Sequence, residues 1–566
     1  MKLVIVGGVA GGAACATRAR RLDAHAKIVV FERGKHVSYS NCALPYHLSD
    51  VIPDHEQLIF MTPKSFKQLH DIDVRTQSEV IAINREAKTV TVKDLQTNTT
   101  YEESYDKLLL SPGASPLRPR SIEGINNNNV FTVRSVEDIC ALKQACDDPS
   151  VKTVCVVGGG FIGLEVVENL VKAGKKTTLL QGGEQILGPF DIEMAHIVHK
   201  ELLDKGVDLR TNTSLFAIED SCVRVTHHEE EQSIPADIVV MAVGVAPETA
   251  LAAQAGLAIG KTRGVLVDAN YRTSDHDIYA VGDVIESYNA ITREPDRLAM
   301  AGPAVKQGRA AADHMCGLSA HNKGFIGSSC IRVFSLSAAC VGLSQSAAKA
   351  AGIPCDAVMV FPTDTVSIMP DSHFMVVKLI FEVPTGKIIG AQAIGKSDAT
   401  KRINVIAAAM SFGATLKDLY DLELCYAPVF STPKDAVTQA AMVGENILEG
   451  RFKQVSVTQA RELVEKGAHI IDVRGTKEFE RGHLKGAHNI PLCELRDRMD
   501  EIPRDEKVYI HCRSGQRSYF AICLLQDHGF TNVYNMSGSF LGISLSEYYK
   551  DVAEKRDPIV TNYNFS

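Results

Sequence analysis

Short apolar runs that end in glycines recur along the first half of the chain. Residues 2–6 read KLVIV and meet a glycine-rich segment at 7–12, after which a helix-like segment leads to a second apolar run at 27–31. The same order returns between 153 and 180, around the glycines of GGGFIG. Apolar β-branched runs of this length predict buried strands, and the polar–apolar alternation between them predicts helices. The pattern therefore predicts two strand–turn–helix units.

Both glycine turns have the chemistry of a dinucleotide site. Glycines let the backbone approach a pyrophosphate, and the following helix N-terminus offers oriented N–H groups. Glu32 stands 20 residues after Gly12, where a carboxylate can accept hydrogen bonds from ribose hydroxyls. Val9 replaces the middle glycine of the first motif, whereas the second motif is complete and is followed by Gln181 in place of the acid. Two such units predict two nucleotides on one chain and leave the choice between NADH and NADPH open.

Composition and charge narrow the class of protein. Hydrophobic residues make up 45% and charged residues 23% of the 566 residues, and the net charge is −8 with no basic run, which argues against nucleic-acid binding. No apolar stretch approaches the roughly 18 residues of a membrane span. The first 16 residues imitate a signal peptide, but their glycines and smooth continuation favour a strand and helix instead. We expect a cytoplasmic protein without a membrane span.

Cysteine spacing excludes several kinds of site. The 14 cysteines are scattered and form no C-x-x-C pair, which argues against a zinc ribbon, a thioredoxin motif and any other metal site. Most of them are expected to be small buried hydrophobic residues. Two stand in distinctive loops, Cys42 in SYSNCALPY and Cys512 in HCRSGQRS. Cys42 has no second cysteine close by in the sequence.

Six motifs in order carry a resemblance to a known family. They are GGVAGG, SxSNCALPY, YDKLLLSPGASP, GGGFIGLEVVENL, IYAVGD and YAPVFSTPKD. The first 450 residues resemble the pyridine nucleotide–disulfide oxidoreductases, more narrowly the coenzyme A disulfide or persulfide reductases, and the last hundred resemble rhodanese. The resemblance implies an α/β fold with two Rossmann-like domains for FAD and NAD(P)H, an α+β dimerisation domain and a C-terminal rhodanese-like α/β domain. The expected bounds are 1–112 with 246–322 for the FAD-binding domain, 113–245 for the NAD(P)H-binding domain, 323–446 for the interface domain, 447–456 for a linker and 457–555 for the rhodanese-like domain.

The resemblance also implies which residues contact the cofactors. In the IYAVGD segment, Asp283 matches the aspartate that holds the flavin ribitol; the alternative is a buried strand that ends in a Gly-Asp turn. The full set of expected cofactor contacts is Gly7, Gly8, Ala10, Gly11, Gly12, Glu32, Arg33, Asn41, Pro112, Gly113, Gly158, Gly160, Phe161, Ile162, Gly163, Gln181, Gly244, Gly282 and Asp283.

By the same resemblance, Cys42 pairs with the thiol of coenzyme A instead of with a second cysteine. The thiolate is the nucleophile, so we expect the flavin and helix N-termini to lower its pKa; the alternative is a buried, inert thiol. The implied coenzyme A groove contains Arg18, Arg21, Ser38, Asn41 and Lys434, although the two arginines also fit a solvated helix face.

Residues in the second half of the chain bear on proton donation at the expected site. Tyr426 matches a family tyrosine that reaches the active site from the partner subunit and can donate a proton to a leaving thiolate; the alternative is a buried interface aromatic. Ile368, Met369 and Phe430 stand where the family often has other residues, tyrosines among them. A missing phenol puts reduction of the bulky disulfide in doubt and favours persulfides, because hydrosulfide is the better leaving group.

The loop after Cys512 is expected to hold a sulfur anion. Successive N–H groups can point inward around it, and two arginines add positive charge. The expected contacts are Arg513, Ser514, Gly515, Gln516, Arg517 and Ser518. A phosphatase-type C-x5-R cradle is the alternative. Asp472 and His483 belong to the matching signature and are expected to be scaffold.

Together these features predict a homodimeric flavoenzyme in which NAD(P)H reduces FAD and FAD reduces a mixed disulfide at Cys42. Its substrates would be coenzyme A persulfide, polysulfide or coenzyme A disulfide, with Cys512 as a sulfur carrier. The alternatives are coenzyme A disulfide reduction with an accessory rhodanese domain, an NADH peroxidase or oxidase that works through a Cys42 sulfenate, and a non-catalytic flavin redox sensor.

Overall fold

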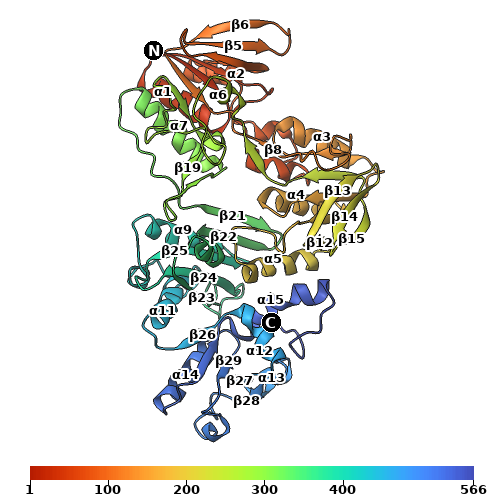
Figure 1. Cartoon of the computed structure of the whole chain (residues 1–566), viewed down its shortest axis with the longest axis vertical. Helices are drawn as coiled ribbons and strands as arrows, with labels where there is room; N and C mark the ends of the chain where they lie inside the picture. Colours follow the sequence, from red (N-terminus) through yellow and green to blue (C-terminus); the bar gives the residue numbers. More distant parts are fainter. Residues whose placement is uncertain (566) are drawn as a thin grey trace. The chain divides into compact units, whose positions relative to one another are not determined.

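The computed structural model describes residues 1–565 and divides the chain into two compact units (Figure 1). The first unit contains residues 1–184 and 210–325, and the second contains 185–209 and the described residues from 326 onward. Segment 185–209 lies inside the expected NAD(P)H-binding domain, yet it packs with the second unit. The expected domain bounds remain a prediction.

A five-stranded parallel sheet forms the base of the first unit, in the order β18-β7-β1-β2-β3. The strands are β1 (Lys2–Val6), β2 (Lys27–Phe31), β3 (Asp73–Arg75), β7 (Lys107–Leu110) and β18 (Ile278–Ala280). Four of the five residues in β1 are buried, as a strand covered on both faces requires. Helices α1 (Ala10–Leu22) and α7 (Ala301–Met315) pack together (Figure 1).

A second five-stranded sheet has the order β12-β11-β10-β16-β9. Its strands are β9 (Val130–Phe131), β10 (Thr153–Val157), β11 (Lys176–Leu180), β12 (Asp208–Arg210) and β16 (Ile238–Met241), and helix α4 (Phe161–Lys172) follows β10. Around the two sheets lie α2 (Pro63–His70), α3 (Val136–Asp147), α6 (Ala250–Gln254), η1 (Asn41–His47), η2 (His55–Leu58), η3 (Gly282–Val284), β4 (Ser78–Asn84), β5 (Thr89–Asp94), β6 (Thr100–Ser104), β8 (Ala114–Pro116), β13 (Thr213–Ile218), β14 (Cys222–His227), β15 (Glu230–Pro235), β17 (Val245–Pro247), β19 (Ser287–Tyr288) and β20 (Pro295–Asp296). The two predicted strand–turn–helix units are thus both present.

The second unit contains an antiparallel sheet, drawn in green to teal in Figure 1, with the order β21-β22-β25-β24-β23. Its strands are β21 (Ser328–Val333), β22 (Leu336–Gly342), β23 (Cys355–Val360), β24 (Met375–Glu382) and β25 (Ile388–Gly395), and its helices are α8 (Gln345–Ala350), α9 (Ala399–Met410), α10 (Leu416–Tyr420) and α11 (Ala436–Leu448). All of β25 and all but the last residue of β24 are buried, so these two strands form the core of the sheet.

The last hundred residues build a separate parallel sheet with the order β26-β30-β29-β27-β28. Its elements are β26 (Lys453–Val455), η4 (Val457–Gln459), α12 (Ala460–Glu465), β27 (His469–Asp472), α13 (Thr476–Glu480), β28 (His488–Asn489), η5 (Met499–Glu501), β29 (Val508–His511), α14 (Gln516–Asp527), β30 (Val533–Met536) and α15 (Ser539–Ala553). The expected α/β fold class with four parts is confirmed by this arrangement and by the family matches reported below.

Buried polar contacts explain why segment 185–209 joins the second unit. Helix α5 (Ile192–Asp204) lies in it. The ammonium of Lys378 on β24 lies 2.9 Å from Asp191 and 2.6 Å from Glu193, which begin this helix. At the other side, His196 Nδ1 lies 2.6 Å from the Ser546 carbonyl oxygen on α15. A buried ammonium needs such partners, so the ion pairs fix the segment to the sheet. None of the helices in residues 1–565 is long and apolar enough to cross a membrane.

Candidate active site

The first glycine turn has no room for a side chain at Gly7 or Gly12. Gly7 has φ +95°, and a Cβ there would lie 2.1 Å from the Ser111 carbonyl oxygen. A Cβ on Gly12 would lie 1.8 Å from the carbonyl oxygen of Gly7. These approaches are far below van der Waals contact, so the turn requires glycine at both positions. The backbone can therefore start helix α1 directly at the end of β1.

Glu32 at the end of β2 organises the same turn. Its carboxylate accepts hydrogen bonds from the backbone N–H groups of Gly8 and Gly34, both at 2.9 Å. These bonds hold the carboxylate at the carboxyl edge of the parallel sheet, where open α/β sheets bind their ligands.

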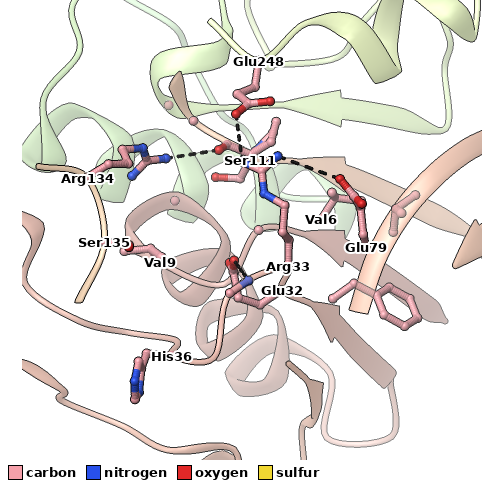
Figure 2. A pocket seen from close by; sticks show the side chains of 18 of the residues that line it. Val6, Val9, Glu32, Arg33, His36, Glu79, Ser111, Arg134, Ser135 and Glu248 are labelled. Carbon is pink, nitrogen blue, oxygen red and sulfur yellow. Dashed lines mark hydrogen bonds and ion pairs between the residues drawn. The ribbon is translucent and has the colours of Figure 1, made fainter. Parts of the chain in front are cut away.

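A cavity of about 710 Å³ opens at this edge (Figure 2). The predicted residues that line it are Gly7, Ala10, Gly11, Glu32, Arg33, Asn41, Pro112, Gly113, Gly282 and Asp283. Two other predicted residues support the turn: Gly8 donates to Glu32, and Gly12 packs on Gly7. The size, the glycine cradle and the oriented carboxylate fit a dinucleotide.

Sequence reasoning missed several charged residues in the lining, among them Glu79, Arg134 and Glu248. Figure 2 shows the Arg33 guanidinium between the two carboxylates, 2.8 Å from Glu248 and 3.9 Å from Glu79. The hydrogen bond to Glu248 is the main reason why the pKa of Arg33 is raised. Glu79 lies on β4 and Glu248 directly follows β17, and neither belongs to one of the six motifs. No local pattern in the sequence marks either residue.

Asp283 lies in η3 at the same edge. Burial raises the pKa of its carboxyl, and the nearby Arg134 opposes that rise. Arg134 is held by hydrogen bonds to the Ala114 and Pro112 carbonyl oxygens, at 2.5 and 3.3 Å. A buried acid with one cation nearby is suited to accept hydrogen bonds from ligand hydroxyls.

The second glycine turn repeats the first. A Cβ on Gly163 would lie 1.9 Å from the Gly158 carbonyl oxygen, and Gly158 itself has φ +110°. The Gly159 N–H donates to the Gln181 side-chain oxygen at 2.9 Å. Gly160 precedes α4 with open space around it, and the helix begins at Phe161.

Two more predicted residues stand beside this turn. Ile162, in the first turn of α4, is 41% exposed. Gly244 follows β16 with φ +104°. A glycine can adopt such a conformation without steric cost, which allows a sharp turn at the carboxyl end of the strand.

Cys42 lies on η1 and its side chain is exposed, so it is not the buried inert thiol of the alternative interpretation. Its neighbour Asn41 lines the cavity. Desolvation raises the pKa of the Cys42 thiol, and the charges of Glu165 and Asp283 raise it further. The expectation that helix N-termini lower this pKa is therefore not met by the chain itself, because burial and, after it, two acidic groups raise the pKa.

Glu165 on α4 is a site residue that the sequence did not single out. Burial, followed by the charge of Glu168, raises the pKa of its carboxyl to about 7. Helix α4 packs against η1, and Ser49 donates a hydrogen bond of 2.5 Å to the Asn169 side chain between them. Glu165 therefore titrates in the neutral range close to the reactive-cysteine loop.

The residues expected in a coenzyme A groove do not form one group. Arg18 is paired with Asp313 at 2.5 Å, whereas Arg21 is exposed and makes no ion pair within residues 1–565. Ser38 joins two loops through backbone bonds to Gly8 and Phe60. Lys434 is exposed and belongs to the second unit, unlike the other four.

The candidate proton donor also belongs to the second unit. Tyr426 is 50% exposed, so it is not buried within its own subunit. Ile368 and Phe430, at 84% and 66%, are exposed as well. A cluster of exposed apolar side chains on a folded domain is typical of a surface that binds another chain.

Cys512 directly follows β29, and its side chain is 1% exposed. The Gly515 N–H donates to its sulfur at 3.1 Å, and the Ser539 hydroxyl lies 3.9 Å from the sulfur. Of the expected cradle, the structure thus shows one backbone N–H on the sulfur. Ser518 is buried and bonded to the Gly515 carbonyl oxygen, and Gln516 begins α14.

The arginines of this loop differ in their partners. Arg517 forms two hydrogen bonds with Glu478, at 2.6 and 2.8 Å. Arg513 has a buried Nη2 with no hydrogen-bond partner among residues 1–565. Ser514 lies half-buried between Arg513 and Gly515. An unpaired guanidinium nitrogen in the Cys512 loop can receive an anion.

Asp472 ends β27, the strand that pairs with β29, and His483 follows α13; their expected role as scaffold remains a prediction. Asp472 is fully buried and binds Arg474, with 2.6 Å between the carboxylate and Nη2. The His483 ring stacks on Phe479 with 3.7 Å between ring centroids. In residues 1–565 no cluster of His, Cys, Asp and Glu is arranged to hold a metal ion.

Comparison with known proteins covers nearly the whole chain. Residues 1–308 match the model of the pyridine nucleotide-disulphide oxidoreductases, 329–437 match the dimerisation domain of that family, and 456–546 match the rhodanese-like domain. Coenzyme A disulfide reductase of Staphylococcus epidermidis is 35% identical over 437 residues, which are 77% of this chain and 98% of the relative.

Two solved structures match in fold as well as in sequence. The reduced CoADR-RHD of Bacillus anthracis has a TM-score of 0.93 at 40% identity and covers 97% of this chain and 98% of its own. A NAD-dependent persulfide reductase from A. fulgidus has a TM-score of 0.91 at 33% identity and covers 96% of this chain and 100% of its own. The chain belongs to the pyridine nucleotide-disulphide oxidoreductase family, with a rhodanese-like domain at its C-terminal end.

Proposed function

We propose that the chain is an FAD-dependent NAD(P)H reductase of coenzyme A persulfide, polysulfide or disulfide, with Cys42 as its single redox cysteine. The exposed, unpaired Cys42 beside the dinucleotide cavity carries this proposal. All 14 cysteines are free, so the chain offers Cys42 no disulfide partner of its own. Similarity to a coenzyme A disulfide reductase, to CoADR-RHD and to a persulfide reductase, at 33–40% identity, supports the same substrate class.

The cofactors supply the electrons and the protein supplies position and charge. When bound, FAD would supply the hydride and electron transfer between NAD(P)H and a disulfide. Glu32, Asp283 and the first glycine turn would hold FAD, and the turn around Gly158 would hold the nicotinamide nucleotide. NADH is the expected donor, since a persulfide reductase that covers this chain is described as NAD-dependent.

The reaction at Cys42 uses one thiolate. The Cys42 thiolate attacks the inner sulfur of a coenzyme A persulfide, the S–S bond breaks, and hydrosulfide leaves, so that a Cys42–coenzyme A disulfide forms. Two electrons and one proton then restore the Cys42 thiolate and release coenzyme A as its thiol. Tyr426 of a second copy of the chain donates that proton in a homodimer formed through residues 329–437.

Cys512 serves as the sulfur carrier. Its persulfide passes the outer sulfur to the thiol of coenzyme A, which leaves the Cys512 thiolate and coenzyme A persulfide. The Gly515 N–H and the unpaired Nη2 of Arg513 stabilise the anionic sulfur.

The test compares Cys42→Ser with Cys493→Ser, which removes another exposed cysteine in the rhodanese-like domain. With NADH and coenzyme A persulfide, we expect Cys42→Ser to lower kcat by a factor on the order of 10³ or more, because no other group replaces the nucleophile. Cys493→Ser is expected to keep the wild-type rate. Mass spectrometry of the wild-type protein should find an adduct of coenzyme A mass on the Cys42 peptide. Full activity of Cys42→Ser, or no adduct, contradicts the proposal.

A further inference from the structure

The segment that carries Tyr426 has no regular structure of its own. Residues 426–430 form neither helix nor strand, and Tyr426, Val429 and Phe430 are all at least half exposed. A segment without ladder hydrogen bonds keeps one conformation only if other groups fix its backbone. The contacts beneath it therefore decide where the tyrosine stands.

One buried cation lies under this segment. Arg402 on α9 is 3% exposed. Its Nη2 lies 3.4 Å from the Phe430 carbonyl oxygen and 3.1 Å from the Asp364 carbonyl oxygen. The same nitrogen lies 3.4 Å from the Ser431 hydroxyl. Arg402 thus joins the Tyr426 segment to a second segment of the chain.

Asp435 balances the buried charge. Its Oδ2 lies 3.1 Å from Arg402 Nη2 and accepts a hydrogen bond of 2.5 Å from the Ser431 hydroxyl. Its Oδ1 accepts a bond of 3.1 Å from the Val437 N–H, so that Asp435 also caps α11. A buried ion pair is costly unless it is well bonded, and here it links α9, α11 and the loop that precedes α11.

The second segment bears a position that the sequence analysis singled out. It runs from Asp364 to Ile368, and the Val366 N–H donates to the Pro428 carbonyl oxygen at 3.2 Å. The contacts of Arg402 and this backbone hydrogen bond are two links between the Tyr426 segment and residues 364–368. Both links join residues just after Tyr426 to the 364–368 segment, so they restrict where Tyr426 can lie relative to Ile368.

We propose that Arg402 is a positioning residue that sets Tyr426 for proton donation to the leaving thiolate. The inference rests on the proposed function of Tyr426. Arg402 itself is buried and does not touch the substrate. Its Nε is buried without a partner in residues 1–565, so the guanidinium acts through the contacts of its Nη2.

The chain offers a matched control in the adjacent residue. Lys401 Nζ approaches the same Phe430 carbonyl oxygen at 3.5 Å, but from an exposed position. Arg402→Met removes the buried charge and all of its bonds. Arg402→Lys keeps the charge and can reach only part of the acceptors, because an ammonium lacks the guanidinium fork. Lys401→Met removes an exposed contact alone.

The first measurement is hydrogen exchange on the full chain. We expect Arg402→Met to speed exchange in peptides that cover 426–431 and 364–368, with exchange in the rhodanese-like domain unchanged. Lys401→Met should leave all of these peptides at the wild-type rate. Unchanged exchange in Arg402→Met overturns the proposal, and this readout requires no knowledge of the substrate.

The second measurement is kinetic. Arg402→Met should lower kcat for coenzyme A persulfide about 10- to 100-fold with little change in KM, since misplaced catalytic groups cost this much. Turnover of NADH with ferricyanide, which needs no proton donor, should stay within about twofold, and Arg402→Lys should recover part of kcat. In a Tyr426→Phe background, Arg402→Met should cause almost no further loss.

The outcomes separate the two proposals. Additive losses in the double variant, or an equal loss with ferricyanide, mean that Arg402 is merely structural and overturn the inference. A wild-type protein that reduces neither coenzyme A persulfide nor coenzyme A disulfide overturns the proposed function, and with it the role in proton donation, whatever exchange shows.

Discussion

The glycine turns after β1 and after β10 place equivalent groups in the same order. In each, the last glycine packs on the first carbonyl oxygen, so that a Cβ would lie 1.8 or 1.9 Å away. In each, the second glycine N–H donates at 2.9 Å to a side chain at the end of the next strand, Glu32 or Gln181. Among the positions that differ, Val9, Ala14 and Glu32 of the first turn match Gly160, Glu165 and Gln181 of the second.

The comparison shows which residues the backbone turn requires and which can vary with the bound nucleotide. A carboxylate and an amide oxygen accept the same backbone bond, so the turn requires an acceptor and no charge. The middle position tolerates a side chain, because Val9 occupies it in the first turn. The first and the last glycine are required in both turns. The charge at the strand end is therefore free to select the nucleotide.

The largest expected effect comes from the shared glycines. Gly12→Ala and Gly163→Ala each force a Cβ against a backbone oxygen, at a cost of about 3 kcal/mol or more. We expect Gly12→Ala to lose flavin absorbance. Gly163→Ala should keep its flavin, which NADH should no longer bleach.

Gly160→Ala is the control for this pair, because nothing lies within 4 Å of a Cβ there. It should fold and bind flavin like the wild type. If Gly163→Ala releases flavin while Gly12→Ala retains it, the assignment of the two turns to FAD and to the nicotinamide nucleotide is reversed.

The next largest effect is expected at Glu165 on α4, because helix α1 has no acid at the matching position. The Glu165 pKa of about 7 lies above the usual 4.5, so the folded chain binds the extra proton between these values. The stabilisation that this raised pKa gives the folded chain is complete below about pH 4.5 and is lost as the pH rises towards 7. Glu165→Gln should remove about 2 kcal/mol of this pH dependence, measured by chemical denaturation at about pH 5 and 7.5.

The same variant tests the surroundings of Cys42. Because the charge of Glu165 raises the pKa of the thiol, Glu165→Gln should speed alkylation of Cys42 near neutral pH. Glu102→Gln, at an exposed acid on β6, should change neither measurement. Equal pH profiles for wild type and Glu165→Gln would contradict the shifted pKa.

The smallest expected effect is on nucleotide choice. Gln181→Glu preserves the bond from the Gly159 N–H and adds the charge that the first turn has. A carboxylate accepts ribose hydroxyls and repels a 2′-phosphate, so the kcat/KM ratio of NADH to NADPH should rise about tenfold, or about 1.4 kcal/mol. An unchanged ratio would show that the strand-end residue does not contact the ribose.

Motifs predicted the dinucleotide turn well because its requirements are local. Gly7, Gly12 and Glu32 sit within one strand–turn–helix–strand segment, so their spacing alone describes the turn. The same holds for Cys512 and Gly515. Glu79, Arg134 and Glu248 complete the same cavity from strands and loops that are far apart in sequence, and no local pattern marks them.

The electrostatics of Cys42 could not be predicted in the same way. The sequence placed a lone thiol in a distinctive loop, yet its pKa is raised first by burial and then by the charges of Glu165 and Asp283, which lie more than a hundred residues away. Arg402 gives the second example, since a cation in an alanine-rich helix is ordinarily expected at the surface. Its partners Asp364, Phe430 and Asp435 meet only in the folded domain.

By itself the sequence determined the order of the domains, the two glycine turns and the two cysteine loops, because backbone geometry and local hydrogen bonding restrict which residues such turns accept. The tertiary structure alone decided which acids surround Cys42, which charges close the cavity and why helix α5 packs with the second unit. Those features depend on burial and on distances between remote segments, and the free energy of a charge is set by what lies around it in space.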